Sequence, residues 1–254
     1  MTHPYLTGTP RPRVLAHRGL VPRDAPEIAS NTLAAFAAAH AAGAAYIETD
    51  CHVTADGELV LFHDDTLESV TGDRRRVDAV TLRELEEQLA GRGGLVTLEQ
   101  ALDAFPDVRF NVDVKAAAAA GPAGRIAATA PDRVLLTSFA DARRRAALRA
   151  AAPARPATSA GRETIIRFLL AVRLRLRAAA ARVLDGIDAL QVPEQQGPLR
   201  IVTPRFVEFA HAAGCEVHVW TVNDTERMRV LVDELGVDGI VTDRADDAIT
   251  VFGN

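Results

Sequence analysis

Cysteine is scarce in this sequence of 254 residues. Its two cysteines, Cys51 and Cys215, are too few for a disulfide framework and do not have the spacing of zinc ligands. Basic residues are not in excess either, since 29 lysines and arginines stand against 34 aspartates and glutamates and the formal net charge is -5. We therefore expect no nucleic acid as a partner, because phosphodiester polymers are bound by basic surfaces.

Long hydrophobic runs are also missing. No stretch reaches the roughly 18 uncharged apolar residues that a membrane span requires. The first residues include three prolines and lack the apolar core of a signal peptide. We expect a cytoplasmic chain without an implied protein partner, and an irregular N-terminal arm over residues 1–12.

Short β-branched runs alternate with alanine- and leucine-rich stretches along the chain, so we predict one α/β domain over residues 1–254. The expected strands are Val14–His17, Ala45–His52, Leu59–His63, Val108–Val114, Val134–Ser138, Arg155–Ser159, Ala189–Val192, Glu216–Val222 and Gly239–Thr242. The expected helices are Asn31–Ala42, Thr81–Leu89, Thr97–Phe105, Asp141–Ala151, Arg162–Val183, Thr203–Ala213 and Asp224–Leu235. Nine strands are one more than an eight-stranded barrel needs, so either one strand is accessory or the sheet is open and doubly wound.

The most informative segment is residues 45–64, AYIETDCHVTADGELVLFHD. Glu48 and Asp50 are two apart on a predicted strand, so their carboxylates share a face and repel unless a cation neutralises them or one takes up a proton. The Asp-Gly dipeptide at 56–57 predicts a two-residue hairpin turn, which would pair Asp50 with His63. The alternative is a pair of surface carboxylates on an edge strand. The apolar neighbours indicate a core strand pair instead, where unpaired acidic residues are rare.

A second candidate segment is VLAHRG, where an apolar strand ends in His17 and Arg18. Barrel enzymes carry their active residues at this end of the strands. Histidine exchanges protons near neutral pH, and arginine offers a rigid fork of donors to phosphate. The alternative, a purely structural histidine at a strand end, loses weight because Glu48, Asp50 and His63 lie on the following strands.

The strand RFNVDVK places Asn111, Asp113 and Lys115 on one face. Lys115 is the only lysine among the 29 basic residues, which indicates a need for a compact ammonium at this strand end rather than chance survival. Trp220, the only tryptophan, either walls a pocket or belongs to the core. We assign to packing the residues without such a constellation: Cys51, His52, Cys215 and His218.

The segments AHRG, NTLAAF, ETDCHVTADGELVLFHD, NVDVK, VHVWTVN and VDGIVTD resemble, in this order, the signature segments of the glycerophosphodiester phosphodiesterase family. Together they span the chain from Val14 to Asp243, and the ETD block is the most specific. The resemblance implies a somewhat distorted (β/α)8 barrel of the TIM type, with a β-hairpin between its second and third strands. It also implies metal-dependent hydrolysis of glycerophosphodiesters, such as glycerophosphocholine, to sn-glycerol 3-phosphate and an alcohol.

The resemblance further implies roles for individual residues. His17 and His63 match the acid–base pair of the family. Glu48 and Asp50 match two carboxylate ligands of one divalent cation. Asp113 lies where the family usually has a third ligand, a glutamate, and is one methylene shorter.

Three positions match those that face the substrate in the family: Arg18 and Lys115 beside the phosphate, and Trp220 near the glycerol pocket. Ser30 departs from the family pattern, which usually has a glutamate before Asn-Thr. Glu27 lies one helical turn earlier, and whether it substitutes stays open. We expect Ser30 to cap the helix that follows it.

A ligand set made only of oxygens suits a hard cation, so we expect Mg²⁺ or Ca²⁺ rather than zinc. The cation would neutralise charge at phosphorus, while one histidine accepts the proton of the nucleophile and the other protonates the leaving alcohol. Either histidine could be the acid. Water and a neighbouring hydroxyl of the substrate both remain as nucleophiles.

Two alternatives stay open. The arginine-rich apolar segment 163–183 could lie on an anionic membrane, which would favour a lysophospholipase D or phospholipase type of enzyme acting on lipid phosphodiesters. The simpler interpretation of that segment is a barrel helix whose arginines face solvent. The other alternative is a catalytically silent barrel used for binding, which the departures at Asp113 and Ser30 keep open.

Overall fold

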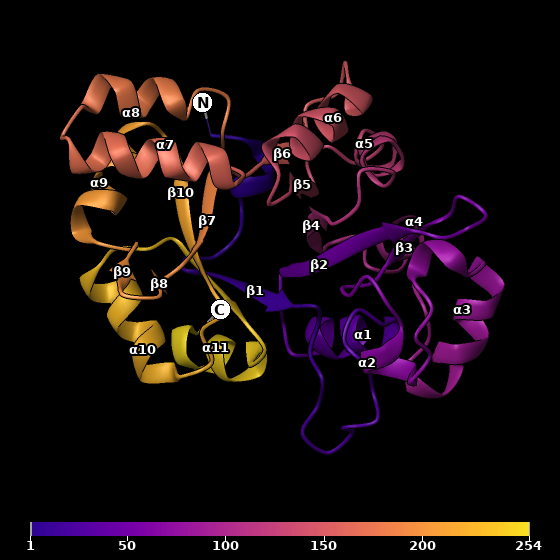
Figure 1. Cartoon of the computed structure of the whole chain (residues 1–254). Helices are drawn as coiled ribbons and strands as arrows, with labels where there is room; N and C mark the ends of the chain where they lie inside the picture. Colours follow the sequence, from indigo (N-terminus) through magenta and orange to yellow (C-terminus); the bar gives the residue numbers. More distant parts are fainter. Residues whose placement is uncertain (1, 254) are drawn as a thin grey trace.

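Eight parallel strands form a nearly closed barrel in the computed structural model, which describes residues 2–253 (Figure 1). In spatial order they are β6 (Ala157–Thr158), β5 (Val134–Thr137), β4 (Arg109–Val114), β2 (Tyr46–Val53), β1 (Arg13–His17), β11 (Gly239–Thr242), β10 (Glu216–Trp220) and β7 (Ala189–Pro193). A parallel bridge between Ser159 and Ala189 joins the two ends of this order. The predicted barrel is confirmed, and the extra strand is β3 (Leu59–Leu61), which pairs antiparallel with β2 outside the ring. The open, doubly wound alternative is wrong.

Helices connect the strands and cover the outside of the barrel. The longer ones are α1 (Leu33–Ala41), α3 (Leu82–Leu89), α4 (Leu98–Ala104), α5 (Ala120–Ala127), α6 (Asp141–Ala151), α7 (Arg162–Arg173), α8 (Arg177–Val183), α9 (Pro204–Ala212) and α11 (Ala245–Phe252). The shorter elements are η1 (Pro4–Leu6), α2 (Glu68–Thr71), η2 (Val77–Ala79), η3 (Ala90–Arg92), α10 (Thr225–Arg229), η4 (Val230–Glu234) and the hairpin of β8 (Gln195–Gln196) and β9 (Leu199–Arg200).

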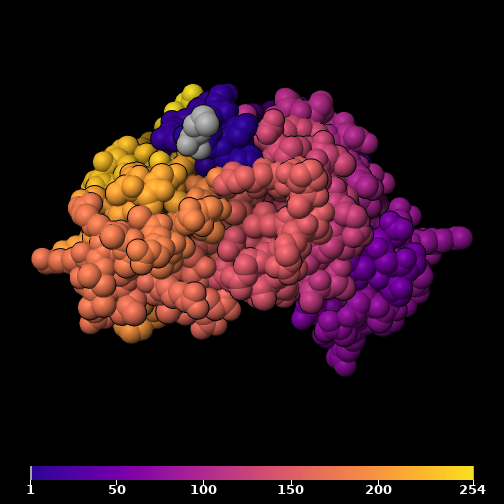
Figure 2. Space-filling view, turned by 90° about the horizontal axis from the view of Figure 1, so that it is seen from above, coloured from indigo at the N-terminus to yellow at the C-terminus, as the bar shows by residue number. Residues whose placement is uncertain are grey.

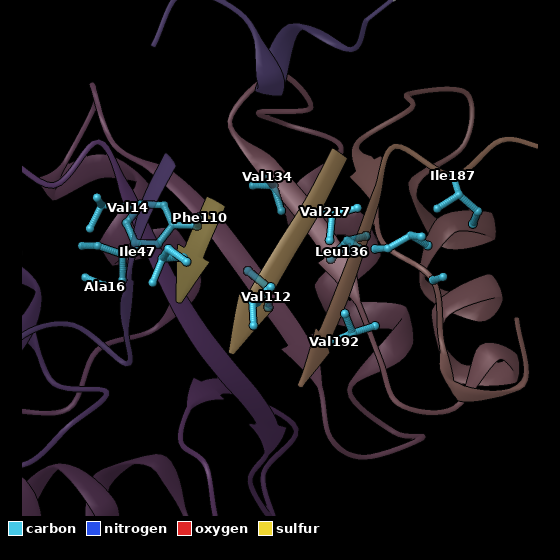
Figure 3. Close-up of a cluster of buried hydrophobic side chains, with 14 of the residues drawn as sticks. Val14, Ala16, Ile47, Phe110, Val112, Val134, Leu136, Ile187, Val192 and Val217 are labelled. Carbon is cyan, nitrogen blue, oxygen red and sulfur yellow. The ribbon is translucent and has the colours of Figure 1, made fainter. Parts of the chain in front are cut away.

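Alternate residues of each strand point outward and pack beneath these helices. Val14, Ile47 and Val112 belong to this layer, which is the main hydrophobic core (Figure 3). The residues between them point into the barrel. Polar side chains on the inner face therefore converge along the barrel axis, toward the carboxyl ends of the strands.

The β2–β3 hairpin has a different register from the predicted one. The N–H of Phe62 donates to the carbonyl of Asp50, so Phe62 rather than His63 lies opposite Asp50. The cause is the turn, because Thr54 and Glu58 close a three-residue loop instead of a two-residue one. The hydroxyl of Thr54 accepts a hydrogen bond from the N–H of Glu58 at 3.0 Å and so stabilises the longer loop.

Two helical regions also differ from the prediction. The predicted helices include none between Val114 and Val134, but α5 forms there and packs on α6. A Cβ on Gly124 of α5 would lie 2.1 Å from the carbonyl oxygen of Ala147, so a glycine is needed for this close approach. The predicted helix over 162–183 is two helices, α7 and α8, separated at Arg175, which has a φ of 58°.

The N-terminal arm is packed rather than irregular. Tyr5 and Leu6 of η1 are buried with inward-facing side chains of the barrel, so the arm plugs the amino-terminal end of the barrel. Arg13 is 1% exposed there, with its Nε 2.6 Å from Oε2 of Glu216 and its Nη1 3.0 Å from the hydroxyl of Tyr46. In Figure 2 the indigo arm lies between the yellow C-terminal part and the magenta central part of the chain. Across residues 2–253, no helix combines the length and the apolar character that a membrane crossing needs.

Candidate active site

A cavity of about 570 Å³ opens at the carboxyl ends of the barrel strands. All the residues assigned to the site from the sequence line it: His17, Arg18, Glu48, Asp50, His63, Asp113, Lys115 and Trp220. The parallel register explains part of this convergence, because it places His17 of β1 beside Glu48 of β2. The same register places Asp50 of β2 beside Asp113 of β4.

The imidazole of His17 is held by a carboxylate on the side away from Glu48. Its Nδ1 lies 2.7 Å from Oδ1 of Asp243, which follows β11. The second oxygen of Asp243 accepts a hydrogen bond of 2.7 Å from Nδ2 of Asn223. The hydrogen bond with His17 holds the pKa of Asp243 below its usual range. With Nδ1 engaged, Nε2 is directed to the site, 3.9 Å from Oε2 of Glu48.

His63 has a matching arrangement. Its Nδ1 lies 2.5 Å from Oδ1 of Asp64, and Asp64 also accepts a hydrogen bond from the hydroxyl of Ser69. Burial would raise the pKa of Asp64, but the hydrogen bonds with Ser69 and His63 outweigh it and lower that pKa. Nε2 of His52 lies 3.2 Å from the carbonyl oxygen of His63, so His52 supports the site as well as packing.

The ammonium of Lys115 lies between two carboxylates. Its Nζ is 2.8 Å from Oδ1 of Asp50 and 2.7 Å from Oδ2 of Asp113. Burial would lower the pKa of Lys115, but the charges of Asp113 and Asp50 outweigh it and raise that pKa. Nε of Arg18 lies 3.3 Å from Oδ2 of Asp50. Two cations therefore compensate two buried carboxylates at the floor of the cavity.

Among residues 2–253, Glu48 has no lysine or arginine side chain as an ion-pair partner, and its Oε2 accepts a hydrogen bond of 3.2 Å from the backbone N–H of Arg18. Its pKa is raised well above the usual range by burial and, secondly, by the charges of Asp50 and Asp113. Within the described part of the chain, two buried oxygens on the neighbouring strand β4, Oδ1 of Asn111 and Oδ1 of Asp113, accept no hydrogen bond. Buried polar atoms are rarely left unpaired, so these oxygens indicate a place for a ligand.

The three predicted metal ligands suit a cation by their chemistry but not by their grouping. The oxygen donors of Glu48, Asp50 and Asp113 have the chemistry that a hard cation prefers. In the part of the chain that the structure describes, however, no three His, Cys, Asp or Glu side chains are grouped as a metal-binding cluster. Lys115 bridges two of the three predicted ligands in this structure.

The loop after β1 has an unusual backbone. Arg18 and Asn31 have φ values of 58° and 59°, in the left-handed region that residues other than glycine adopt uncommonly. Nδ2 of Asn31 donates a hydrogen bond of 3.0 Å to Oδ2 of Asp50. Gly19 has a φ of 85°, and a Cβ there would lie 2.8 Å from the carbonyl group of Ala35. The His-Arg-Gly run therefore requires its glycine.

The opposite side of the cavity is apolar. Trp220 walls it, with its ring edge-on to Phe139 at a centroid distance of 5.9 Å. The ring of Phe139 also lies 5.6 Å from Nζ of Lys115, a cation–π contact. The remaining apolar lining on this side includes Ile165, Ile166, Leu169, Pro193, Leu199 and Ile201.

Several residues of the site are missed by the sequence analysis. Asp243, Asn223 and Phe139 are among them, although each follows a strand at the same end of the barrel as His17. Asp243 and Asn223 even lie within segments that carry the family resemblance. Their position after a strand is the signal that could have found them.

Ser30, which departs from the family pattern, and the nearby Glu27 lie outside the main cavity. Ser30 and Glu27 line a neighbouring cavity of about 330 Å³, which shares Arg18 and His63 with the main one. The prediction that Ser30 caps the following helix is wrong. Thr32 caps α1, because its side chain accepts a hydrogen bond from the N–H of Ala35.

The residues assigned to packing are buried. Cys51 and Cys215 are free thiols in the core. His218 lies inside the barrel, where its Nε2 is 3.1 Å from Oε2 of Glu216. Burial would raise the pKa of Glu216, but hydrogen bonds from Arg13 and His218 outweigh it and lower that pKa to about 2.

Comparison with known proteins identifies the family. The model of the glycerophosphoryl diester phosphodiesterase family matches residues 17–247. A Mycobacterium tuberculosis protein named "Probable glycerophosphodiester phosphodiesterase 2" is 41% identical over 235 residues, which cover 91% of this chain and 87% of that protein.

Solved structures share the fold. A glycerophosphodiester phosphodiesterase from Thermotoga maritima superposes with a TM-score of 0.71 and 24% identity, over 94% of this chain and 97% of that one. An Oleispira antarctica phosphodiesterase, in complex with the product sn-glycerol-3-phosphate, has a TM-score of 0.70 and 20% identity, over 96% and 98% of the two chains. Since the family model covers most of its length, the chain belongs to the glycerophosphoryl diester phosphodiesterase family and is an enzyme of the phosphodiesterase class.

Proposed function

We propose that this enzyme hydrolyses glycerophosphodiesters to sn-glycerol 3-phosphate and an alcohol, with His17 and His63 as its acid–base pair. Family membership and the relative of 41% identity support the reaction class. The observation that carries the assignment of the pair is the shared geometry of the two imidazoles. Each has its Nδ1 on a carboxylate, Asp243 for His17 and Asp64 for His63, which leaves Nε2 as the nitrogen that can exchange a proton.

The remaining polar groups bind and orient the phosphodiester. Arg18 and Lys115 supply donors for the phosphate oxygens at the floor of the cavity. One histidine takes the proton of the attacking hydroxyl and the other protonates the leaving oxygen, a contribution of typically about 10² to 10⁴ in rate. Trp220 packs against the glycerol part of the substrate, because its ring lines the same cavity as Arg18 and Lys115.

The proposal includes one divalent cation, Mg²⁺ or Ca²⁺, held by Glu48, Asp50 and Asp113. Bound there, it would neutralise the negative charge of the phosphodiester. Two observations support this assignment. Burial and the charges of Asp50 and Asp113 raise the pKa of Glu48, so a cation beside it would be stabilising, and Oδ1 of Asp113 is a buried oxygen without a hydrogen bond among residues 2–253.

The test is release of sn-glycerol 3-phosphate from a panel of glycerophosphodiesters, first with EDTA and then with added Mg²⁺ or Ca²⁺. His17→Ala and His63→Ala should each lower turnover at least about a hundredfold while leaving the circular dichroism spectrum intact. His40→Ala is the matched control, since His40 is an exposed histidine of α1 that also contacts an aspartate. Turnover like that of the unmodified enzyme in either site variant would contradict the assignment.

A lipid phosphodiester is the second candidate substrate. The apolar side of the cavity favours it, because Ile165, Ile166 and Leu169 could contact an acyl chain attached to the substrate. The same assay with a lysophospholipid discriminates between the two. If a folded, metal-loaded chain released no product from either class, the catalytically silent alternative would stand.

A further inference from the structure

Most of the exposed large hydrophobic side chains among residues 2–253 belong to one region of the surface. All but Leu33 lie at the mouth of the cavity or along α7 and the turn after it: Phe139, Ile166, Leu170, Leu174, Leu176 and Leu199. Figure 1 shows α7 and α8 side by side on the flank of the barrel away from α3. An exposed apolar patch of this kind on a protein surface marks a contact with another molecule.

The patch extends beyond what a substrate in the cavity can cover. Ile166 lines the cavity, whereas Leu170 and Leu174, each 57% exposed, do not. These three residues are four apart in sequence and so form one stripe along α7. The stripe therefore runs outward from the cavity mouth and needs a larger occupant than a small molecule.

The same segment is strongly basic. Residues 162–183 contain six arginines and one acidic residue, Glu163, in a chain whose overall formal charge is -5. The carboxylate of Glu163 is already hydrogen-bonded at the start of α6, because its Oε2 accepts a hydrogen bond of 3.0 Å from the N–H of Asp141. Arg177 pairs with Glu208. The other arginines, Arg162, Arg167, Arg173, Arg175 and Arg182, form no ion pair within residues 2–253.

We propose that the exposed face of α7 and its following turn bind an anionic lipid surface and so hold the mouth of the cavity against it. At the α-helical angle per residue, Arg173 borders the leucine stripe on one side and Arg167 on the other. Leucines and isoleucine would enter the acyl boundary, while the flanking guanidinium groups meet lipid phosphates. A second copy of the chain fits this surface poorly, because a symmetric contact would bring arginine against arginine.

The test is co-sedimentation of the full chain with phosphatidylcholine vesicles, with and without phosphatidylglycerol. The chain should pellet with the anionic vesicles and remain in the supernatant with the neutral ones. The double variant Arg167→Gln/Arg173→Gln should lower the partition coefficient at least about tenfold, because each basic side chain near an anionic surface multiplies it about fivefold. Leu170→Gln/Leu174→Gln should lower it by a similar factor.

Two controls match these changes. Leu33→Gln alters an exposed leucine, 42% accessible, at the start of α1. Arg125→Gln/Arg149→Gln removes the same charge from exposed positions of α5 and α6. Both controls should bind as the unmodified chain does. Equal losses in the controls and the α7 variants, or an unmodified chain that stays in the supernatant with anionic vesicles, would overturn the proposal.

Two further measurements distinguish lipid binding from self-association and from an effect on turnover. A dimer in size-exclusion chromatography that the leucine variant dissociates would assign the patch to self-association and overturn lipid binding. Turnover of a water-soluble glycerophosphodiester should be unchanged in the α7 variants, since none of the altered residues lines the cavity. Vesicle binding requires no turnover, so failure of the proposed hydrolysis would leave this test valid.

Discussion

Oδ1 of Asp243 lies 2.7 Å from Nδ1 of His17, on the side of the imidazole away from Glu48. This contact orients the ring and fixes which nitrogen is free to exchange a proton. Asp243 is not among the residues that line the cavity. If His17 acts as proposed, we expect Asp243 to position it rather than to contact the substrate.

Asp243→Asn should lower kcat by about ten- to a hundredfold and leave KM nearly unchanged, because it disturbs the orientation of His17 and not the contacts with substrate. Steady-state kinetics on a soluble glycerophosphodiester measure the split. Asp107→Asn, which alters an exposed aspartate beside His40, is the control and should have no effect. An increase in KM with unchanged kcat would instead assign Asp243 to substrate binding.

Replacing Lys115 by arginine should lower kcat/KM at least about a hundredfold. The ammonium fits between Asp50 and Asp113 at distances of 2.8 and 2.7 Å, and a planar guanidinium cannot occupy the same gap in the same way. Lys115→Met should also lower the free energy of unfolding by about 3 to 5 kcal/mol, because it leaves buried carboxylates uncompensated. Urea unfolding provides the second measurement. A fully active Lys115→Arg enzyme would show that only the charge matters.

Cation binding can be measured without turnover. Mg²⁺ or Ca²⁺ at a hundred times its Kd should raise the free energy of unfolding by about 2.7 kcal/mol in the EDTA-stripped protein. The increase should be absent in Glu48→Gln and reduced in Asp113→Asn, because each removes a charged oxygen donor. Asp103→Asn, an exposed change, serves as control. If neither Mg²⁺ nor Ca²⁺ raises the thermal unfolding temperature, the proposed function does not include a metal.

Glu216 should make the stability of the barrel depend on pH in the acid range. Its pKa is lowered to about 2 in the folded protein, so its stabilising effect is fully present above its ordinary pKa and is lost as pH falls toward 2. At about 1.4 kcal/mol per pKa unit, the loss amounts to at most about 3 kcal/mol.

The free energy of unfolding, measured from pH 6 to pH 2, should therefore fall less steeply in Glu216→Gln than in the unmodified protein. Glu216→Gln should be less stable at neutral pH, since Arg13 loses its buried partner. Glu226→Gln, at an exposed ion pair with Arg229, should leave the pH dependence unchanged. Parallel curves for the Glu216 variant and the unmodified protein would contradict the assigned ionisation.

Much of the fold could be predicted because strand and helix periodicities are local properties of the sequence. The strands around Glu48 and Asp113 are found within a residue or two of their bounds. The errors fall where packing overrides local preference. The helix α5 forms despite its glycines because Gly124 lets it approach α6, and the hairpin register shifts because Thr54 stabilises a longer turn.

The sequence by itself determined which side chains share the inner face of a strand, because the pleat of a β-strand repeats every two residues. Glu48 with Asp50, and Asp113 with Lys115, follow from that rule alone. Only the tertiary structure decided that Asp243 orients His17. These residues are 226 positions apart, and they meet because β11 pairs with β1 as the barrel closes. No local pattern reports which strands become neighbours across such a distance, so that contact could be found only in the folded chain.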